Sequence, residues 1–437
     1  MPFDLPIRAP IPIFHFLVPF SPTEFSLFIN AAFELRTVLA SWLHLVMDFS
    51  LSSDHILIRD TVRLFMETEM RPVLRDYERA EKFPSAQLKK LGELGCCGML
   101  IPEEWGGAGT DTVSYALMLE EVARVDASTA VALSVTNSVV AVPLWKSGTE
   151  QQKKAYLARL SRGEILGAFC LTEPQAGSDA AGIQTRAVRD RNHYVLNGTK
   201  AWVTNGGVAG LYIVFAKTDP AAGSRGVSAF LVEPDFPGFR ISRYEDKMGL
   251  RLSRSAEISL QDCRVPAENR LGEEGQGLRI ALESLDGGRI GIAAQSVGVG
   301  QGALEAATLY AKQRKTFGHP IAEYQAIQWM LADMETEVCA ARVLTHYAAW
   351  QRDKESQGRE VGNTQARPRG SSASRAKLYA SEMANRVAYK AVQVHGSSGY
   401  SRETDVERYY RDARVLTIYE GTSEMQRLVI ARDLLRH

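Results

Sequence analysis

Beyond residue 50, apolar residues recur three and four positions apart, which is the spacing of one buried helix face. The clearest case is HILIRDTVRLFMETEMRPVL (55–74). Two later helices have recognisable starts: Asp111 is an N-cap candidate for DTVSYALMLEEVARV, and Thr149 opens a T-x-x-Q capping box. These patterns predict an N-terminal helical domain over residues 51–163.

The spacing changes at about residue 164 to short β-rich segments such as HYVLNGTKAWVTN and LYIVFAKT. Asn-Gly, Gly-Gly and Asp-Pro turn signals separate these segments. No helical stretch lies between them, which excludes alternating βαβ units. The pattern therefore predicts an antiparallel barrel or sandwich over residues 164–274.

Helical spacing returns over residues 275–437 and predicts an antiparallel four-helix bundle. The long helical stretches are 276–316, 321–355, 373–396 and 423–437. The segment 354–374 has almost no large apolar residue, which predicts a flexible surface loop. The expected fold class is α+β and mostly helical, with helical, β and helical-bundle domains in that order.

The first 50 residues fit none of these patterns. Residues 1–46 contain apolar and aromatic stretches broken by Pro, Asn, Glu and Arg, without the basic start and cleavage site of a secretory signal. They are also not Arg-rich enough for a transit peptide. Met47 begins a segment typical of a domain start, so we interpret the preceding residues as a non-matching extension from an upstream start. No apolar run reaches the roughly 18 residues that cross a bilayer, so no membrane span is predicted.

Charge and cysteine content narrow the function classes. The 437 residues contain 51 basic and 51 acidic residues, and the pI is about 7.1, which argues against nucleic acid or an anionic membrane as partner. Five scattered cysteines, odd in number and without ligand-like spacing, indicate a reducing compartment, and the adjacent pair Cys96-Cys97 is interpreted as buried apolar thiols rather than a redox pair. The eight histidines lack ligand spacing, so no metal site is predicted.

Two tempting patterns are set aside. GVGQGAL (298–304) does not match the dinucleotide fingerprint G-x-G-x-x-G and does not follow a strand. The small residues over 291–303 instead predict a close approach of two bundle helices. No G-x-S-x-G motif points to a nucleophilic serine.

Three motifs, in the order of the three domains, carry chemistry: FCLTEPQAGSD (169–179), KAWVTNGG (200–207) and IYEGTSEMQRLVIARDLL (418–435). Together they resemble the acyl-CoA dehydrogenase family. The resemblance runs from about Leu51 to the C-terminus, apart from the 354–374 segment, and the short-chain and short/branched-chain members are most similar.

Glu420 stands out within the third motif. It lies in a loop just before Ser423 and Gln426, which read as the capping box of a final helix. Taken alone, a solvated acid near a helix start is the commoner explanation. The resemblance instead assigns Glu420 as the base that removes the α-proton of an acyl thioester, work that suits a carboxylate whose pKa is raised by desolvation.

The resemblance also implies FAD as cofactor and a set of residues that bind it. These are Phe169, Leu171, Thr172, Gly177, Ser178, Trp202, Val203, Thr204, Arg314, Phe317, Gln325, Gln393, Val394, Gly396, Ser397, Thr422 and Glu424. In the family, the positions matching Trp202 and Thr204 flank the flavin ring, and the segment matching Arg314 reaches the FAD of a neighbouring subunit. Many members have two glycines where this chain has Gly396 followed by Ser397, a departure that main-chain contacts can tolerate.

The same resemblance places Ser178, Asp286, Arg289, Tyr419 and Gly421 at the substrate. Some members carry the base on the first long bundle helix instead, at the position of Gly288, which offers no carboxylate here. An i,i+3 ion pair between Asp286 and Arg289 is the simpler explanation of those two residues.

The expected reaction is FAD-dependent dehydrogenation of an acyl-CoA, with a short chain favoured, to trans-2-enoyl-CoA, as in fatty acid β-oxidation. Flavin N5 would accept the hydride and an electron-transfer flavoprotein the electrons. The family further implies a homotetramer, and we expect a bacterial cytoplasmic location rather than the mitochondrial matrix. An acyl-CoA oxidase on the same fold, distinguished by hydrogen peroxide production, and a non-catalytic nucleic-acid-binding relative are the alternatives.

Overall fold

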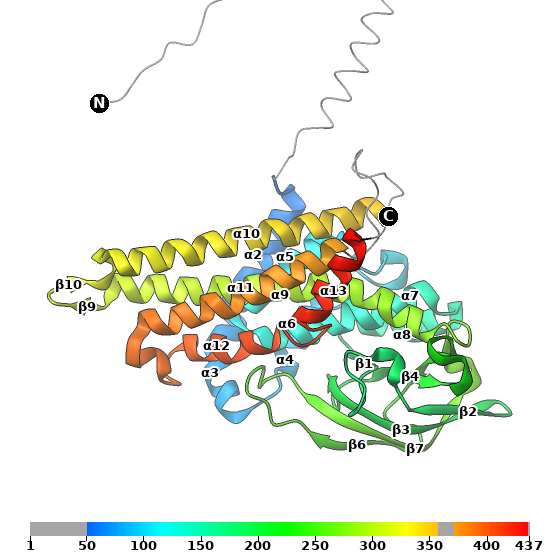
Figure 1. Ribbon diagram of the computed structural model, residues 1–437. Helices are drawn as coiled ribbons and strands as arrows, with labels where there is room; N and C mark the ends of the chain where they lie inside the picture. Colours follow the sequence, from blue (N-terminus) through cyan, green and yellow to red (C-terminus); the bar gives the residue numbers. More distant parts are fainter. Residues whose placement is uncertain (1–49, 357–370, 436–437) are drawn as a thin grey trace, which may run out of the picture. The chain divides into compact units, whose positions relative to one another are not determined.

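The computed structural model describes residues 50–356 and 371–435. The chain divides into two units, Met1–Ser52 and Ser53–His437. The extension expected at residues 1–50 therefore lies almost wholly outside the described residues. The second unit contains the helices and strands that follow (Figure 1).

The N-terminal part of this unit is helical. The helix bounds are α2 (Ser53–Phe65), α3 (Arg71–Ala80), α4 (Ser85–Glu93), α5 (Thr112–Val125), α6 (Ala127–Ser134), α7 (Val142–Ser147) and α8 (Glu150–Ser161), with π-helical turns η1 (Met66–Met70) and η3 (Val135–Ala141). The side chains expected on the buried face are buried at four-residue spacing: Val62, Met66, Met70 and Leu74. The predicted helix starts are confirmed, since Asp111 accepts a hydrogen bond from a first-turn N–H and Thr149 forms a complete capping box.

Helices α6 and α7 join through η3 into one continuous segment, Ala127–Ser147. By length and composition this is the one segment of the described residues able to cross a membrane, although no unbroken apolar run marks it in the sequence. Its most apolar stretch is completely buried within the unit. It is thus placed as a core helix.

The middle strands form one sheet of eight strands with the path β6-β7-β3-β2-β4-β5-β8, and β1 pairs with β4. Their bounds are β1 (Gly167–Cys170), β2 (Arg186–Asp190), β3 (His193–Thr204), β4 (Leu211–Lys217), β5 (Val227–Val232), β6 (Phe239–Tyr244), β7 (Ser255–Pro266) and β8 (Arg270–Leu271). Most pairs are antiparallel, as expected, but β1 and β2 both pair with β4 in parallel. Strand β1 contacts η3 and β5 contacts the first long bundle helix, which attaches the sheet to the helices.

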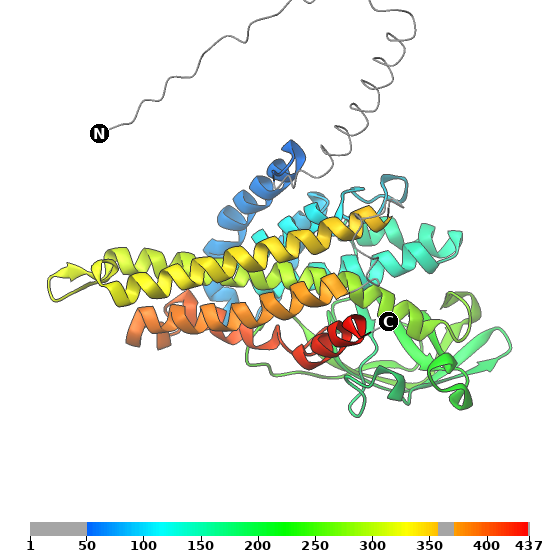
Figure 2. The same cartoon turned by 45° about the horizontal axis from the view of Figure 1, so that its top comes forward.

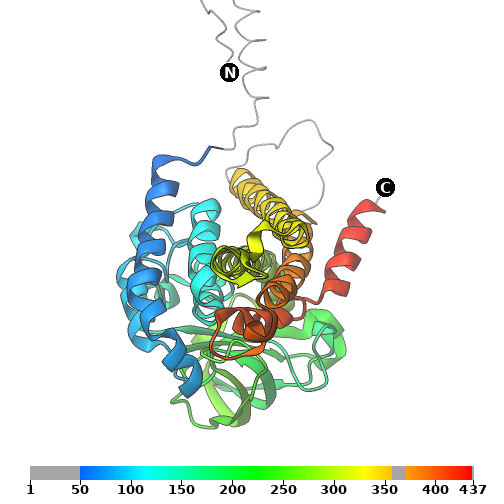
Figure 3. The ribbon, with the colours of Figure 1, turned by 90° about the vertical axis from the view of Figure 1, so that its left-hand side faces the viewer.

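The C-terminal part of the unit consists of three long helices followed by two shorter ones. Their bounds are α9 (Gly277–Gln313), α10 (Gln325–Ser356), α11 (Ser371–His395), α12 (Asp405–Val415) and α13 (Ser423–Leu434), with a hairpin of β9 (Lys315–Thr316) and β10 (His319–Pro320) between α9 and α10. Short 3-10 helices complete the chain: η2 (Glu103–Trp105), η4 (Ala180–Gly182), η5 (Pro220–Gly226), η6 (Ala267–Asn269), η7 (Ile321–Glu323) and η8 (Gly396–Tyr400). Figure 3 shows α9 in the middle, with α5, α10 and α11 around it.

Small residues let α9 lie directly on α5, a helix of the N-terminal domain, whereas the sequence predicts a close approach between two bundle helices. A Cβ added to Gly298 would come 2.2 Å from the carbonyl oxygen of Glu120, and one added to Gly302 would come 2.4 Å from that of Arg124. Both carbonyls belong to the backbone of α5 and cannot move aside. Larger residues would therefore separate the two helices.

Two details differ from the sequence prediction. Helix α12 was not predicted, although Val406, Tyr409 and Ala413 are buried at helical spacing and Thr404 precedes the helix. The predicted 354–374 loop is too long, because α10 continues to Ser356 and α11 begins at Ser371. Its middle lies outside the described residues. Low apolar content misled the prediction, because the last turn of α10 is partly exposed and the first turn of α11 is buried through small residues, Ser371, Ala373 and Ser374.

Candidate active site

The loop between α12 and α13 holds Glu420 in an uncommon backbone conformation. Glu420 has a φ of 51° and Gly421 a φ of 94°, so two consecutive residues are left-handed. For a residue other than glycine, this conformation costs about 1–3 kcal/mol. Thr422 then starts α13, and its side chain accepts a hydrogen bond from the N–H of Met425 at 3.3 Å.

This loop turns the carboxylate of Glu420 onto the backbone of α9. A Cβ added to Gly288 would lie 1.8 Å from Oε2 of Glu420 and 2.8 Å from Oε1. Oε2 is buried and has no hydrogen-bond partner within the described part of the chain, although the residue as a whole is partly exposed. Burial raises the pKa of Glu420 to about 7, while the cations of Arg289 and Lys377 act in the opposite direction.

The predicted capping box at the start of α13 is wrong by one residue. Thr422, rather than Ser423, is the N-cap, and the hydroxyl of Ser423 is buried without a partner among the residues the structure describes. Gln426 does not reach back to a cap N–H. Its Nε2 donates instead to the carbonyl oxygens of Glu420 at 3.3 Å and Gly421 at 2.9 Å. The left-handed turn presents these carbonyls to α13, and the sequence pattern does not reveal that turn.

A second donor holds the same loop from α11. Lys377 is fully buried, and its Nζ donates to the carbonyl oxygen of Gly421 at 2.8 Å. The N–H of Glu420, in contrast, makes no hydrogen bond with any described residue. The loop is thus held through its carbonyls and leaves one backbone donor available beside the carboxylate. Sequence reasoning missed Lys377, because a lysine on a helix usually reads as a solvated cation.

The predicted substrate residues on α9 flank Gly288. Nη1 of Arg289 donates to Oδ1 of Asp286 at 2.5 Å, which is the i,i+3 pair anticipated from their spacing. The Nε of Arg289 is buried without a partner among the described residues. Burial raises the pKa of Asp286. The two side chains are close to the carboxylate site, with hydrogen-bonding capacity left over on the arginine.

One helical turn further along α9, buried side chains close against the helix. The hydroxyl of Tyr115 and the Oγ of Ser134 are 3.0 Å apart, and a Cβ added to Gly291 would come 2.5 Å from each. The hydroxyl of Tyr419 donates to Oε1 of Gln295, one turn beyond. The space along α9 is therefore filled soon after Gly288.

The flavin residues expected in the β domain come together where β1 ends and β3 ends. The N–H of Ala201 donates to the carbonyl of Thr172 at 2.9 Å, which joins the two motif segments. Beneath them, the buried Nζ of Lys200 lies 2.7 Å from Oε1 of Glu173. The amide of Asn205 fixes the end of β3 to α6, donating to the carbonyl of Ala132 at 3.2 Å.

Several groups in this cluster have unused binding capacity. The hydroxyls of Thr172 and Thr204 make no hydrogen bond with other described residues. Trp202 has a left-handed φ of 58° and is 60% exposed, although Ala201 and Val203 on either side are buried. Phe169 and Leu171 lie in or next to β1, whereas Gly177 and Ser178 are exposed on the following loop. An exposed indole beside unpaired hydroxyls suits a planar ligand with polar edges.

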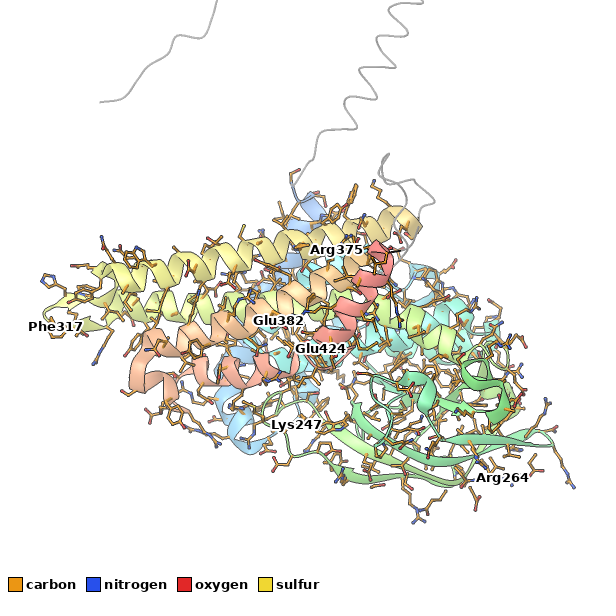
Figure 4. The ribbon with its side chains drawn as sticks, in the orientation of Figure 1. Lys247, Arg264, Phe317, Arg375, Glu382 and Glu424 are labelled. Carbon is orange, nitrogen blue, oxygen red and sulfur yellow. The ribbon has the colours of Figure 1, made fainter. Side chains whose placement is uncertain are left out.

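The remaining cofactor residues lie elsewhere. Arg314 and Phe317 are at the hairpin β9–β10, at the opposite end of the long helices from the sheet (Figures 1 and 2). Phe317 is 91% exposed and stands at the tip of that hairpin (Figure 4). Gln325 begins α10, Gln393 and Val394 end α11, and Gly396 and Ser397 follow in η8. Thr422 and Glu424, in contrast, lie beside Glu420 at the start of α13. One chain therefore does not bring all the predicted cofactor residues together.

The chain belongs to the acyl-CoA dehydrogenase family. The family models for the N-terminal, middle and C-terminal domains of acyl-CoA dehydrogenase match residues 52–164, 168–263 and 275–435. Members of this family are FAD flavoproteins, and the chain is accordingly an FAD-dependent oxidoreductase. The unpaired hydroxyls of Thr172 and Thr204 and the exposed ring of Trp202 fit that cofactor.

Individual relatives cover most of the chain. The short-chain specific acyl-CoA dehydrogenase of Clostridium acetobutylicum is 43% identical over 390 residues, which is 89% of this chain and 100% of that protein. The solved butyryl-CoA dehydrogenase from Megasphaera elsdenii is 43% identical with a TM-score of 0.85, covering 89% of this chain and 100% of its own. A chain from a structural study of the electron transferring flavoprotein of Acidaminococcus fermentans is 45% identical with a TM-score of 0.86, covering 90% and 100%.

Proposed function

We propose that this enzyme dehydrogenates short-chain acyl-CoA thioesters to trans-2-enoyl-CoA, with Glu420 as the base that takes the α-proton. One observation carries the proposal: the carboxylate of Glu420 is buried on α9 with an unpartnered oxygen and a pKa raised to about 7. A desolvated carboxylate is a stronger base than a solvated one. The α-C–H group of a thioester is a weak acid, so its deprotonation needs such a base.

The loop also supplies a donor for the charge that develops during proton removal. The N–H of Glu420 is unpaired within the described residues and can donate to the thioester oxygen as enolate charge forms. A donor already in place stabilises that charge without reorganisation, which lowers the barrier for the chemical step. FAD, when bound, accepts the β-hydride. Thr172, Trp202 and Thr204 would hold its ring, and Ser178 would lie toward its pyrophosphate.

A short acyl chain is favoured by the filled space past Gly288. Tyr115 and Ser134 are both completely buried and close on α9 at Gly291, one turn beyond the carboxylate. A long chain entering beside α9 would need to displace this hydrogen-bonded pair. Two of the relatives described above, a short-chain specific enzyme and a butyryl-CoA dehydrogenase, support the same choice.

The division of the cofactor residues supports assembly from at least two copies. Because Arg314 and Phe317 lie at the end of the bundle opposite the sheet, they can contribute to an FAD site only in another copy of the chain. We propose a homotetramer built from two such dimers. The likeness to a chain from a study of an electron transferring flavoprotein supports such a flavoprotein as the electron acceptor. We further propose a bacterial cytoplasmic location; the similar enzyme from Clostridium acetobutylicum is also bacterial.

A substrate series tests this function directly. Purified protein would be assayed with straight and branched acyl-CoAs of increasing length, using an artificial dye as acceptor. We expect kcat/KM to peak at short straight chains and to fall once the chain reaches Tyr115. A maximum at long chains would contradict the proposed substrate. Formation of hydrogen peroxide at rates matching turnover without dye would indicate an oxidase instead.

A further inference from the structure

Side chains from two different helices donate hydrogen bonds to two adjacent carbonyls of the loop that carries Glu420. Nζ of Lys377, on α11, donates to the Gly421 carbonyl at 2.8 Å, and Nε2 of Gln426, on α13, donates to the same oxygen at 2.9 Å. Gln426 also reaches the Glu420 carbonyl. Both side chains are fully buried. Gly421 has no room for a side chain here, since an added Cβ would come 2.6 Å from Nε2 of Gln426.

We propose that Lys377 is a positioning residue for proton abstraction: its ammonium group fixes the Gly421 carbonyl and places a positive charge behind the Glu420 carboxylate. This inference rests on the proposed role of Glu420 as the base. In this role Lys377 does not contact the substrate or the reacting atoms. It acts through the loop and through the charge it presents to Glu420.

The burial of Lys377 gives the first argument. A buried ammonium group is costly unless it is paired, and the side chain of Lys377 has no carboxylate within ion-pair distance among the described residues. Its one hydrogen bond goes to the loop. A methionine would fill the same space without the cost. The lysine is thus poorly explained by packing and well explained by what it does to the loop.

The charges around the two groups give the second argument. Lys377 is surrounded by charged groups from three helices besides Glu420: Arg289 on α9, Glu382 on α11 and Glu424 on α13. Glu420 is surrounded, besides Lys377, by Arg289 on α9, Tyr115 on α5 and the adjacent Tyr419.

Burial lowers the pKa of Lys377 to about 8, and the Glu420 carboxylate opposes that change. Near neutral pH the lysine is therefore charged while Glu420 titrates. Arg289 also lowers the pKa of Glu420, and more strongly, but its guanidinium donates to Asp286. Among the described residues, Lys377 is the cation that acts on the carboxylate and also holds the loop.

Three variants separate the charge from the hydrogen bond. Lys377→Met removes both, Lys377→Gln keeps a donor without charge, and Gln426→Met removes a neutral donor. Lys390→Met, on a partly exposed face of α11 where Lys390 pairs with Asp333 and Glu337, is the matched control. Each full-length flavoprotein is checked for FAD content. It is then mixed anaerobically with butyryl-CoA from about pH 6 to 9, and the rate of flavin bleaching is recorded.

Loss of the charge should move the acidic limb of the rate profile upward by about one pH unit in Lys377→Met and Lys377→Gln. Loss of a loop hydrogen bond should lower the limiting rate about tenfold or more in Lys377→Met and Gln426→Met, because the base is less well placed. Gln426→Met should keep the wild-type midpoint, and Lys390→Met should match wild type in both measures. If Lys377→Met yields no flavoprotein, the midpoint of Lys377→Gln decides.

An unchanged midpoint and limiting rate in the Lys377 variants would overturn the positioning role. That outcome is distinct from failure of the proposed base, which is tested by Glu420→Gln. If Glu420→Gln is inactive and the Lys377 variants are normal, the base stands and the role of Lys377 fails. If Glu420→Gln remains active, both proposals fall together.

Discussion

The carboxylate of Glu420 rests on the Cα of Gly288: a Cβ on that glycine would come 1.8 Å from Oε2. The two residues are 132 positions apart in the sequence and belong to different elements, the α12–α13 loop and α9. Only glycine at position 288 leaves room for the carboxylate of Glu420. A side chain growing from position 288 would therefore point to the spot that Glu420 now occupies.

Replacing Glu420 with glutamine should abolish most dehydrogenation. Glutamine keeps the shape of the side chain, but its amide cannot accept the α-proton, so the rate of flavin reduction by butyryl-CoA should fall about 10²–10⁴-fold. FAD content and acyl-CoA affinity should stay close to wild type, because the loss lies in the chemical step. Near-normal turnover by this variant would refute the assignment of Glu420.

A small change at Gly288 should disturb the base without removing it. Gly288→Ala forces the carboxylate to move, and a displacement of about 1 Å can lower the rate about 10²-fold. Gly287→Ala is the control, since its added methyl would meet the flexible end of Arg352 at 2.9 Å rather than the base. Steady-state kcat for the two alanine variants gives the comparison, and equal losses would speak against the contact.

The base should be transferable between the two positions. Gly288→Glu in an otherwise intact protein places two carboxylates in one space, whereas Gly288→Glu combined with Glu420→Gly frees the room and restores one carboxylate. We expect the double variant to exceed Glu420→Gly alone by about tenfold or more in turnover. The exchange with glycine is required, because glutamine at 420 would still occupy the space. No recovery would show that the helix position cannot reach the α-carbon.

The pH dependence of kcat/KM should show an acidic limb with a midpoint near 7. Burial raises the pKa of Glu420 to about 7, so the carboxylate that accepts the proton forms as the pH rises through that value. Activity should therefore increase from below neutral pH and level off above it. A midpoint near 4.5, the ordinary value for a glutamate, would mean that the carboxylate is solvated in the working enzyme.

Two defective chains should complement each other if FAD sites are shared between copies. Trp202→Ala and Arg314→Ala should each lower FAD content, since they remove opposite sides of every site. When the two variants are unfolded and refolded together, half of the dimers are mixed and each mixed dimer has one intact site, which restores about a quarter of the wild-type FAD. Recovery of no FAD on mixing would argue that each chain binds its cofactor alone.

The sequence predicts those parts of the molecule that depend on local chemistry. Asp111 and Thr149 cap their helices as expected because capping depends on nearby backbone N–H groups. The stripe of small residues on α9 predicts that another helix lies close to it, because such an approach needs only the absence of side chains, but it does not reveal that the partner is α5 rather than a bundle helix. Glu420 was identified through the motif in which it lies, and its role there remains a proposal.

The sequence does not predict features set by distant partners. Ser423 was chosen as the cap because it has the right spacing to Gln426, but the left-handed turn at Glu420 shifts the cap to Thr422. The role of Lys377 could not be predicted, because no pattern in the sequence of α11 indicates that its amine donates to a carbonyl 44 residues away. The contact between Gly288 and Glu420 has the same origin, because it depends on how a loop crosses a helix.

The left-handed backbone at Glu420 also affects which substitutions at this position can be accepted during evolution. As far as the backbone is concerned, glycine would be easier to hold there than glutamate by about 1 kcal/mol or more. A single substitution to glycine would thus relax the loop and remove the carboxylate in one step. If Glu420 is the proposed base, mutations that only stabilise the fold would inactivate the enzyme, so folding does not protect this carboxylate. If it is maintained, turnover is what maintains it.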